Sequence, residues 1–209
     1  MAGNGDAENE RARLVRLAME LIEASGKDVT RAELASAAKV SRARVEALFP
    51  EDIDLFDAVV ERWFEHHIAI MEEVLASDLP PNRKLYEFFA RRFRLQRARY
   101  RADQAAFKVY CELGAAHFER VRSYVDLADH YLCELIAQAQ AEGAFPELAI
   151  DEALSLINQM VLPYTMADII TFMDERLSEE KLGRIVDTIF VGLSGADRGA
   201  RGIAGLRAA

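Results

Sequence analysis

The sequence is poor in cysteine, and this scarcity excludes two kinds of cross-linked fold. Only Cys111 and Cys133 are present among 209 residues, 22 positions apart. Neither belongs to a C-x-x-C pair or lies near histidines at zinc-ligand spacing, so neither a zinc site nor a disulfide framework is indicated. A chain of this length can bury a core without such cross-links. We expect two buried free thiols, as in a reducing compartment.

The sequence also lacks a long apolar run. Its first ten residues, MAGNGDAENE, are polar and acidic and contain no apolar segment of the kind found in signal peptides. The longest weakly charged stretch, residues 153–167, includes Asn158, Gln159 and Pro163. It is shorter than the roughly 18–20 apolar residues that span a bilayer. We therefore expect a cytoplasmic protein with no membrane partner.

Strand patterns are missing, and proline is rare. The chain has five prolines and no run of alternating β-branched residues. Apolar residues instead recur every three to four positions, which predicts an all-α protein of about nine helices. The expected helices span about 10–24, 30–38, 42–48, 52–76, 82–100, 102–114, 118–142, 151–174 and 178–193. Residues 195–209, rich in Gly, Ala and Arg, are expected to form a disordered tail.

No pattern typical of catalysis or metal binding is present. The sequence contains neither a paired nucleophile and base nor a glycine-rich phosphate loop. The histidines at 66, 67, 117 and 130 form no convincing metal set, because the first two point to different faces of one helix and no carboxylate spacing completes a site. The sequence thus indicates neither an enzyme nor a bound cofactor or metal.

The chain has no excess of positive charge, yet its charge is unevenly distributed. The formal net charge is −9 at pH 7. Residues 1–50 carry eight basic and eight acidic side chains, so the whole negative charge lies in residues 51–209. Between positions 27 and 45, five basic residues face two acidic ones. An acidic body with a locally basic tip can still dock on phosphates, because affinity depends on the charges at the contact.

The N-terminal segment has the spacing of a helix-turn-helix. Residues 30–33, Thr-Arg-Ala-Glu, form a capping box that begins a short helix. Residues 39–40 make a tight turn, Ser41 is an N-cap for a second short helix, and Pro50 ends it. Two short helices joined by a tight turn, after a longer first helix, are the skeleton of a helix-turn-helix. We expect residues 1–50 to form a DNA-binding domain.

Residues 34–50, LASAAKVSRARVEALFP, resemble the signature of the TetR/AcrR family of transcriptional regulators. The matching anchors are Leu34, Ala35, Ala38, Val40, Ser41, Val45, Phe49 and Pro50. Specific similarity covers about residues 10–64, and the rest of the chain is similar in length and helical plan. The resemblance implies a ligand-binding and dimerisation domain over residues 51–194. It also implies a homodimer that binds a palindromic double-stranded DNA operator and a small-molecule effector.

The sequence departs from the family signature at several DNA-contacting positions. Lys39 replaces the turn glycine, Ala43 an early glycine of the reading helix, and Arg44 the threonine after it. Glu46 and Asp52 replace an aromatic residue and a lysine that contact phosphate in the family, and each acid would repel DNA. Nearby basic residues could compensate, and an arginine can read guanine bidentately, although solvated surface charges are the alternative. The predicted DNA-contacting residues are Arg31, Lys39, Ser41, Arg42, Ala43, Arg44 and Ala47.

The C-terminal helices are apolar enough to need a partner. The expected helix over 151–174 is apolar nearly all round, so it must be covered on all sides. The resemblance implies a four-helix bundle between two subunits, built from this helix and the last one. Burial of both helices within a monomer is the alternative. The predicted interface residues are Leu162, Met166, Ile169, Ile170, Leu182, Ile185 and Ile189.

The middle helices are dense in aromatic residues, most of which are expected in the core. The polar residues Asn158, Gln159 and Thr165 need partners if they are buried. Pro163 should kink their helix. These features fit one wall of an apolar pocket that has a few orienting polar groups. The predicted pocket residues are Phe89, Phe93, Phe107, Tyr110, Tyr124, Asn158, Met160 and Tyr164.

Residues 91–101 contain six arginines. A solvated helix face is the ordinary interpretation, and an acidic ligand or an electrostatic cap at a helix end is the sharper one.

The whole pattern predicts a regulator, most simply a repressor, that a small apolar or amphipathic effector releases from its operator by tilting the helix over 52–76. The alternative is a dimeric helical ligand-binding protein whose head no longer binds DNA, which Glu46 and Asp52 favour.

Overall fold

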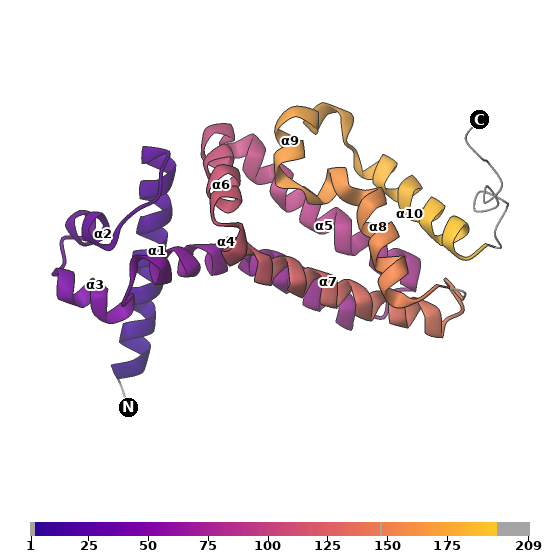
Figure 1. The fold of residues 1–209 in the computed structure, drawn as a ribbon, viewed down its shortest axis with the longest axis horizontal. Coiled ribbons are helices and arrows are strands. Elements are labelled where there is room, and N and C mark those ends of the chain that lie inside the picture. The colour runs from indigo at the N-terminus through magenta and orange to yellow at the C-terminus, as the bar shows by residue number, and fades with distance from the viewer. Residues whose placement is uncertain (1–2, 147, 196–209) are drawn as a thin grey trace, which may run out of the picture.

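The computed structural model describes residues 3–146 and 148–195, and every regular element within those ranges is a helix (Figure 1). The predicted all-α fold is confirmed. The elements are α1 (Gly3–Ser25), α2 (Arg31–Ala38), α3 (Arg42–Leu48), α4 (Asp52–Ala76), α5 (Pro81–Ala102), α6 (Gln104–Ala116), α7 (Phe118–Ala141), α8 (Ile150–Thr165), α9 (Ala167–Met173), the 3₁₀ turn η1 (Asp174–Arg176) and α10 (Glu179–Leu193). The expected disordered tail lies outside the described residues, apart from Gly195.

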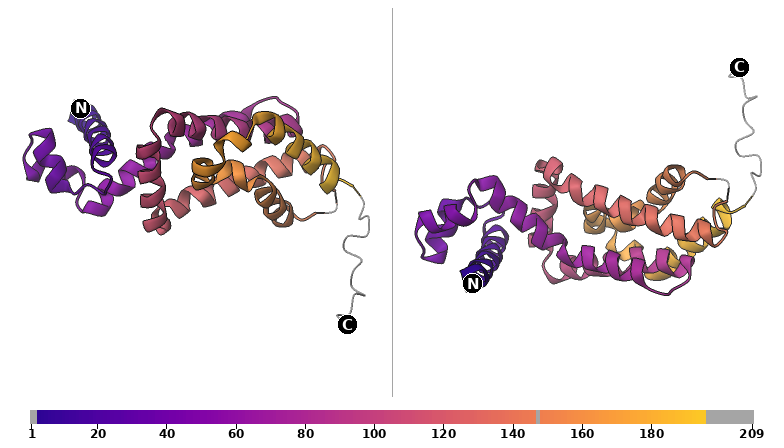
Figure 2. Two further views of the ribbon diagram at one scale, coloured as in Figure 1. Left: turned by 90° about the horizontal axis from the view of Figure 1, so that it is seen from above. Right: turned by 90° about the horizontal axis from the view of Figure 1, so that it is seen from below.

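The molecule is elongated, with a small head at one end and a larger body at the other. Helices α1–α3 form the head, and α4 runs from the head into the body (Figure 1). The views from above and below show the same arrangement, with the head projecting from the end of the body (Figure 2). Each part has its own cluster of buried apolar residues. In the body, α5 packs against α4, α7, α8 and α10.

The head has a small core of its own. Leu14, Leu34, Val45 and Phe49 are fully buried in it, and Leu55 at the start of α4 joins them. These residues come from four helices, so the first turns of α4 pack as part of the head. A shift of α4 would therefore carry the head with it.

Local capping signals place the helices of the head. The Thr30 hydroxyl accepts a hydrogen bond from the Glu33 N–H, and the Glu33 carboxylate accepts one from the Thr30 N–H at 2.9 Å. This is the predicted capping box, which satisfies N–H groups that the helix itself leaves free. The first helix begins at Gly3 rather than near residue 10, because its polar first turns lie beyond the apolar face from which the start was predicted.

The helix predicted over 151–174 is two helices. Pro163 removes one backbone donor, and α8 ends at Thr165, whose hydroxyl donates to the Leu162 carbonyl at 3.2 Å. Met166 is extended, and α9 starts after it with a bend of 51°. The predicted kink is thus a full break, so the described part has ten α-helices. No single helix there is long and apolar enough to cross a membrane, and only α8 together with residues 167–176, a bent pair, meets that test.

Candidate nucleic-acid interface and effector cavity

The turn between α2 and α3 takes an unusual backbone conformation at Lys39. Its φ of 56° and ψ of 41° lie in the left-handed region, which glycine enters without steric cost. The Lys39 N–H donates to the Ser36 carbonyl at 3.3 Å, and the Val40 N–H donates to the Ala35 carbonyl at 3.1 Å. These two bonds form a Schellman motif. The turn therefore keeps the geometry for which the family uses glycine, with a lysine side chain added.

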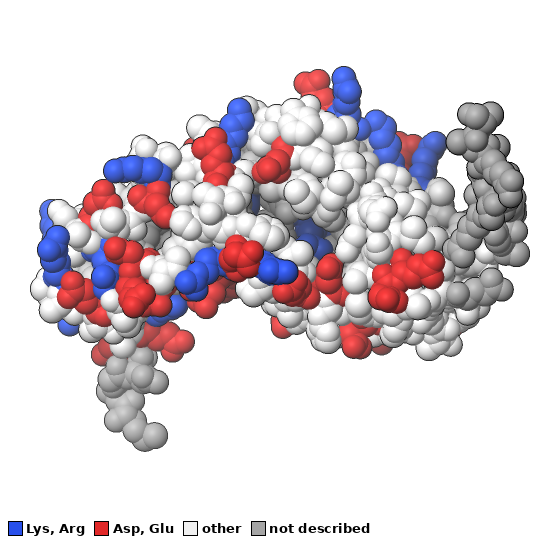
Figure 3. Space-filling view, viewed as in Figure 1, with Lys and Arg blue, Asp and Glu red and all other residues white. Residues whose placement is uncertain are grey.

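Helix α3 exposes one face and buries the other. Val45 is fully buried, whereas Arg42, Ala43, Arg44 and Ala47 are exposed. The Ser41 hydroxyl caps the helix by accepting from the Arg44 N–H at 3.3 Å. Lys and Arg side chains reach the outer edge of the head, with acidic side chains beside them (Figure 3). The exposed face has the width and the side chains that a major groove accepts.

An unpredicted ion pair holds Arg44. Its Nε donates to both carboxylate oxygens of Glu10, at 2.7 and 2.8 Å, and its second guanidinium nitrogen lies 2.6 Å from the same carboxylate. The hydrogen bond from Arg44 holds the pKa of the Glu10 carboxyl below its usual value. Glu10 lies on α1, 34 positions earlier, in the stretch that was expected only to start a helix. Reading a base with Arg44 therefore requires this pair to open.

A second ion pair joins the starts of α2 and α4. The Asp52 carboxylate accepts from the Arg31 backbone N–H at 2.8 Å and from the Arg31 Nε at 3.1 Å. The same guanidinium also donates to the carbonyls of Phe49 and Pro50. The backbone hydrogen bond from Arg31 lowers the pKa of Asp52. Asp52 was expected mainly to repel phosphate, whereas its geometry also gives it a structural role.

Lys39 and Arg42 differ from these two arginines. Neither makes an ion pair within the described ranges, and both are exposed. Glu46, on the same outer face, is likewise exposed and has no basic partner in the part of the chain that the structure describes. The turn before α3 and the outer face of α3 thus present two cations and one carboxylate without an ion pair among the described residues.

The body contains an apolar cavity of about 290 Å³ close to the head. It lies among α4, α5, α6 and α7, and its rim includes the break between α8 and α9. Its aromatic lining residues are Phe56, Trp63, Phe64, Phe107, Tyr110, Phe118 and Tyr124. Sites for small ligands have this character, with apolar walls and a few polar groups.

The structure brings only part of the predicted pocket together. Phe107, Tyr110 and Tyr124 line the cavity. Phe89 and Phe93 lie instead in the closed core of the body.

The three predicted pocket residues on α8 also lie elsewhere. Tyr164 packs on Phe93 with ring centroids 5.1 Å apart, and Met160 is 37% exposed on the surface. Asn158 donates to Asp129 on α7 at 2.9 Å, so its amide already has a partner. The polar groups of this helix thus mostly bond within the protein, and only Thr165 reaches the cavity.

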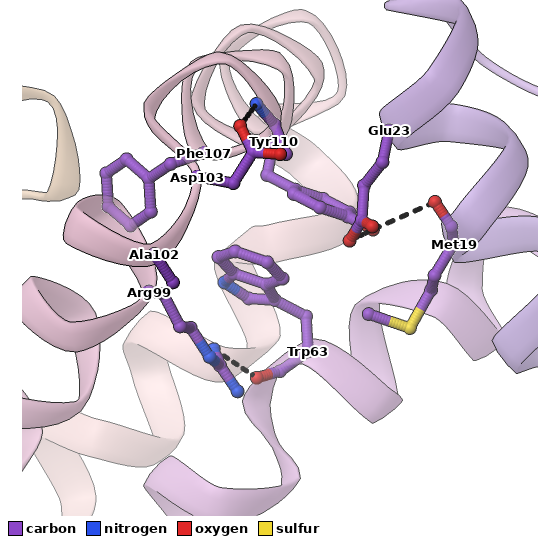
Figure 4. A pocket seen from close by; sticks show the side chains of 9 residues that line it. Met19, Glu23, Trp63, Arg99, Ala102, Asp103, Phe107 and Tyr110 are labelled. Atoms are coloured by element: carbon purple, nitrogen blue, oxygen red, sulfur yellow. Dashed lines mark hydrogen bonds between the residues drawn. The ribbon is translucent and has the colours of Figure 1, made fainter.

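A second, smaller space of about 250 Å³ lies where the head meets the body (Figure 4). Trp63, Phe107 and Tyr110 line both spaces and form the wall between them. Trp63 and Tyr110 stack with ring centroids 4.1 Å apart. The Tyr110 hydroxyl, which has one hydrogen to donate, lies 3.1 Å from Glu23 Oε1 and 3.4 Å from the Met19 carbonyl, two acceptors on α1. One tyrosine therefore contacts the cavity and the head together.

Two polar side chains of α5 enter the apolar cavity wall. Arg92 is 9% exposed and Gln96 is 7% exposed, and both line the cavity. Arg92 donates to the Tyr124 hydroxyl at 3.1 Å, while its Nε and the Gln96 Oε1 have no hydrogen-bond partner among the described residues. Both residues belong to the run of residues 91–101 for which an acidic ligand was one interpretation, but neither was predicted to line the pocket. Their i, i+4 spacing within an apolar helix stripe is the signal that would have placed them there.

The other five arginines of residues 91–101 have partners within the protein. Arg91 pairs with Glu73 on α4, Arg94 with Glu179 on α10, and Arg97 and Arg101 with Asp174 after α9. Arg99 donates to the Trp63 carbonyl at 2.9 Å. The ordinary interpretation of a solvated helix face thus describes this run poorly, because most of its charges tie helices together.

The predicted dimer residues divide by exposure. Ile170, Leu182 and Ile189 are fully buried within the protomer, which removes them from any surface. Leu162 and Met166 are 45% and 47% exposed. Ile169 and Ile185 are half-buried. Phe172 and Val191, which were not predicted, are the most exposed large apolar residues of the described chain, at 72% and 74%.

Two further expectations concern cysteine and metal. Cys111 and Cys133 are free and half-buried rather than fully buried. Burial raises the pKa of the Cys111 thiol to about 12, with a smaller effect from its hydrogen bond to Asp168. Among the described residues, no group of three or more His, Cys, Asp or Glu side chains is placed to hold a metal ion.

Comparison with known proteins identifies the family to which the chain belongs. A helix-turn-helix head joined to an all-helical body defines the fold of a transcriptional regulator. Residues 81–186, half of the chain, match the family model described as "Tetracyclin repressor-like, C-terminal domain". The chain belongs to the TetR family of regulators. No curated protein sequence matches it.

Solved structures share the fold at low sequence identity. A Clostridium perfringens protein described as a fatty acid metabolism regulator is 16% identical, with a TM-score of 0.59 over 85% of this chain and 96% of that one. A TetR-family regulator from Mesorhizobium loti is 17% identical, with a TM-score of 0.64 over 90% and 96%. The ketosteroid transcriptional regulator of Mycobacterium tuberculosis is 17% identical, with a TM-score of 0.52 over 88% and 93%.

Proposed function

We propose that the protein is a DNA-binding transcriptional repressor that a small molecule in the body cavity releases from its operator. In this proposal residues 1–50 bind DNA, and residues 51–194 bind the effector and dimerise. The observation that carries it is Tyr110, which lines the cavity and whose hydroxyl donates to acceptors on α1 of the head. An arrangement in which one side chain contacts both parts lets occupancy of the cavity change the position of the head.

Contact with DNA rests on the exposed face of α3 and its flanks. Arg42 is free to enter the major groove, and Lys39 to reach a flanking phosphate. Arg44 joins once Glu10 releases it, since the Arg44 side chain is 62% exposed and a base or phosphate can approach it from solvent. Arg31 is the weakest member of the predicted set, because it is already bonded to Asp52 and to two carbonyls.

Coupling rests on the wall of Trp63, Phe107 and Tyr110. A ligand that enters the cavity presses on the stacked Trp63 and Tyr110 rings. A movement of Tyr110 away from α1 lengthens its hydrogen bond to Glu23 and so loosens the contact between α1 and the body. Ligand affinity then differs between the two positions of the head, which is the requirement for allosteric control.

Removing one hydroxyl tests this coupling. Tyr110→Phe keeps the ring that lines the cavity and removes the hydrogen bond to α1. Since a hydrogen bond contributes about 0.5–1.5 kcal/mol, we expect an effector to weaken DNA binding about 2- to 10-fold less in the variant. Tyr131→Phe is the matched control, because its hydroxyl bonds Glu72 away from the cavity. Equal effector responses in Tyr110→Phe and the natural chain would contradict the coupling.

Dimerisation rests on the exposed apolar side chains of α8–α10. Leu162 lies on α8 and Val191 on α10, which pack against each other, and Met166 lies at the break after α8; the three side chains are 45%, 74% and 47% exposed in that order. Exposed apolar patches of this kind mark protein contacts. A two-fold dimer also fits the reading of two half-sites on DNA.

Direct DNA binding is tested by fluorescence anisotropy with duplexes from the intergenic region upstream of the coding sequence. We expect Arg42→Ala to weaken binding of the preferred duplex, because it removes an exposed, unpaired cation of the reading helix. Arg122→Ala, on the exposed surface of α7, is the control. Equal affinities for both variants and the natural chain would contradict the proposed interface.

A second function is a dimeric ligand-binding protein that no longer binds DNA. The exposed Glu46 on the reading helix favours it, since a carboxylate there repels phosphate. If the natural chain binds no duplex at low salt and Glu46→Tyr does, this second function is correct. Asp52→Lys is a poorer test, because it also removes the acceptor of the Arg31 N–H.

A further inference from the structure

Arg92 differs from the other arginines of α5 because its guanidinium is buried and has no ion-pair partner among the described residues. It is buried in the wall of an apolar cavity, and it makes no ion pair with any carboxylate in the described ranges. Its protein contacts are the Tyr124 hydroxyl and the faces of two aromatic rings, Phe88 at 4.9 Å and Tyr124 at 5.9 Å. A buried charge without a counter-ion costs free energy, because water no longer solvates it.

Packing alone does not explain this placement. Arg91 and Arg94, beside it on α5, both pair with carboxylates, so acidic partners are at hand on neighbouring helices. His67, the nearby buried imidazole, is neutral at pH 7, because burial and then the charges of Arg92 and Arg99 lower its pKa to about 3. The protein therefore places one cation in the cavity wall and pairs it with no carboxylate of the described residues.

Gln96 adds a second polar group on the same wall. It lies one turn after Arg92 on α5, lines the same cavity, and its Oε1 is enclosed without a partner. An amide of this kind donates to an acid oxygen in one orientation and accepts from a hydroxyl in the other. Two buried polar side chains with unused hydrogen-bonding capacity thus face an otherwise apolar space.

We propose that the cavity binds an apolar monocarboxylic acid, whose carboxylate contacts Arg92 and Gln96 and whose hydrocarbon part lies among the aromatic rings. This inference rests on the proposed function, since it names the effector class for the same cavity. A single guanidinium matches a single carboxylate. Asp168 is the other charged lining residue of the described chain, and this exposed acid would repel the second charge of a dianion.

The size of the cavity limits the acid. A volume of about 290 Å³ holds about ten water-sized groups of roughly 30 Å³ each. Octanoate and 3-phenylpropanoate have about this many non-hydrogen atoms, and their alcohols, octan-1-ol and 3-phenylpropan-1-ol, have nearly the same shape without the charge. The four compounds form two matched pairs.

Trp63 supplies a direct readout. It is the one tryptophan of the sequence, and it lines the cavity. Each compound is titrated into the full-length protein at pH 7.5 while the fluorescence of Trp63 is recorded. We expect at least one acid to bind at least about tenfold more tightly than its alcohol, since hydrogen bonds to a charged group are strong.

Variants of Arg92 test whether this side chain causes the tighter binding of the acid. Arg92→Met should abolish the preference for the acid while leaving the alcohol bound, and Arg92→Lys should restore part of it. Arg94→Met, on the other face of the same helix, is the control. Arg92→Met should also raise the melting temperature of the ligand-free protein, because it removes an unpaired buried charge. A merely structural role for Arg92 would lower it.

The outcomes separate the two proposals. Equal binding of acid and alcohol, an acid preference that survives in Arg92→Met, or no binding of either acid at millimolar concentration would overturn the inference. Anisotropy with operator DNA is measured on the same samples. Release of DNA by the alcohols as well as the acids would leave the regulator proposal intact while rejecting the acid class, and absence of DNA binding would reject the regulator proposal alone.

Discussion

Lys39 gives a prediction in which stability and DNA binding change in opposite directions. Its left-handed backbone, with φ of 56°, costs an L-residue roughly 1–2 kcal/mol and costs glycine nothing. A glycine at this position also makes the unfolded chain more flexible, which stabilises the unfolded state by roughly 0.4–1 kcal/mol and offsets part of the relief of strain. We therefore expect Lys39→Gly to raise the free energy of unfolding by about 0.5–1 kcal/mol. The hydrogen bonds of the turn use backbone atoms only, so they survive the substitution.

The same substitution removes a charge that we place on a phosphate. Lys39→Gly should weaken binding to all duplexes and lower the slope of log affinity against log salt by about one. Urea unfolding followed by circular dichroism gives the stability, and anisotropy at several salt concentrations gives the slope. Lys39→Ala is the matched control, since it removes the charge and keeps the backbone strain. A variant Lys39→Gly that is less stable than Lys39→Ala would refute the reasoning from strain, and an unchanged slope in both would refute the phosphate contact.

Three further predictions concern other parts of the molecule. Glu10→Gln should release Arg44 and strengthen binding to DNA, most visibly at low salt in a gel shift; weaker binding would show that the pair positions Arg44 for the operator. Val191→Glu should convert the proposed dimer to monomers in light scattering while the circular dichroism spectrum stays helical, and an unchanged mass would show that Val191 lies outside the interface. The pKa of His67 is lowered to about 3, so the unfolded chain takes up a proton between pH 6.5 and 3 that the folded chain refuses. Stability should fall by about 1.4 kcal/mol per pH unit across this window as the pH decreases, and His67→Phe should flatten the decrease; an equal slope in both proteins would assign it to other groups.

Local signals in the sequence predicted the head well. The capping box at Thr30, the N-cap at Ser41 and the stop at Pro50 each act within a few residues, so the boundaries of α2 and α3 were accessible from the sequence. The ion pairs of the head were not accessible. Arg44 meets Glu10 across 34 positions, and Arg31 meets Asp52 across 21. Such pairs depend on how helices cross, which periodicity does not describe.

The cavity and the surface of the body were predicted less well for a related reason. Helical periodicity identifies which side chains face inward, and Phe89 and Phe93 do so. It does not identify which inward residues border a space and which fill it. In the same way, a helix that is apolar on all sides does not reveal which side its own body covers. Ile170 and Ile189 were therefore assigned to a partner although the protomer itself buries them.

The linkage between the cavity and the operator tests the central claim most directly. An apolar ligand that changes the fluorescence of Trp63 is titrated into the protein alone and into the protein saturated with operator DNA. Because coupling is reciprocal, we predict that DNA weakens ligand binding by the same factor by which the ligand weakens DNA binding, typically about 5- to 150-fold. Identical ligand affinities with and without operator would contradict the account, since the cavity and the head would then act independently.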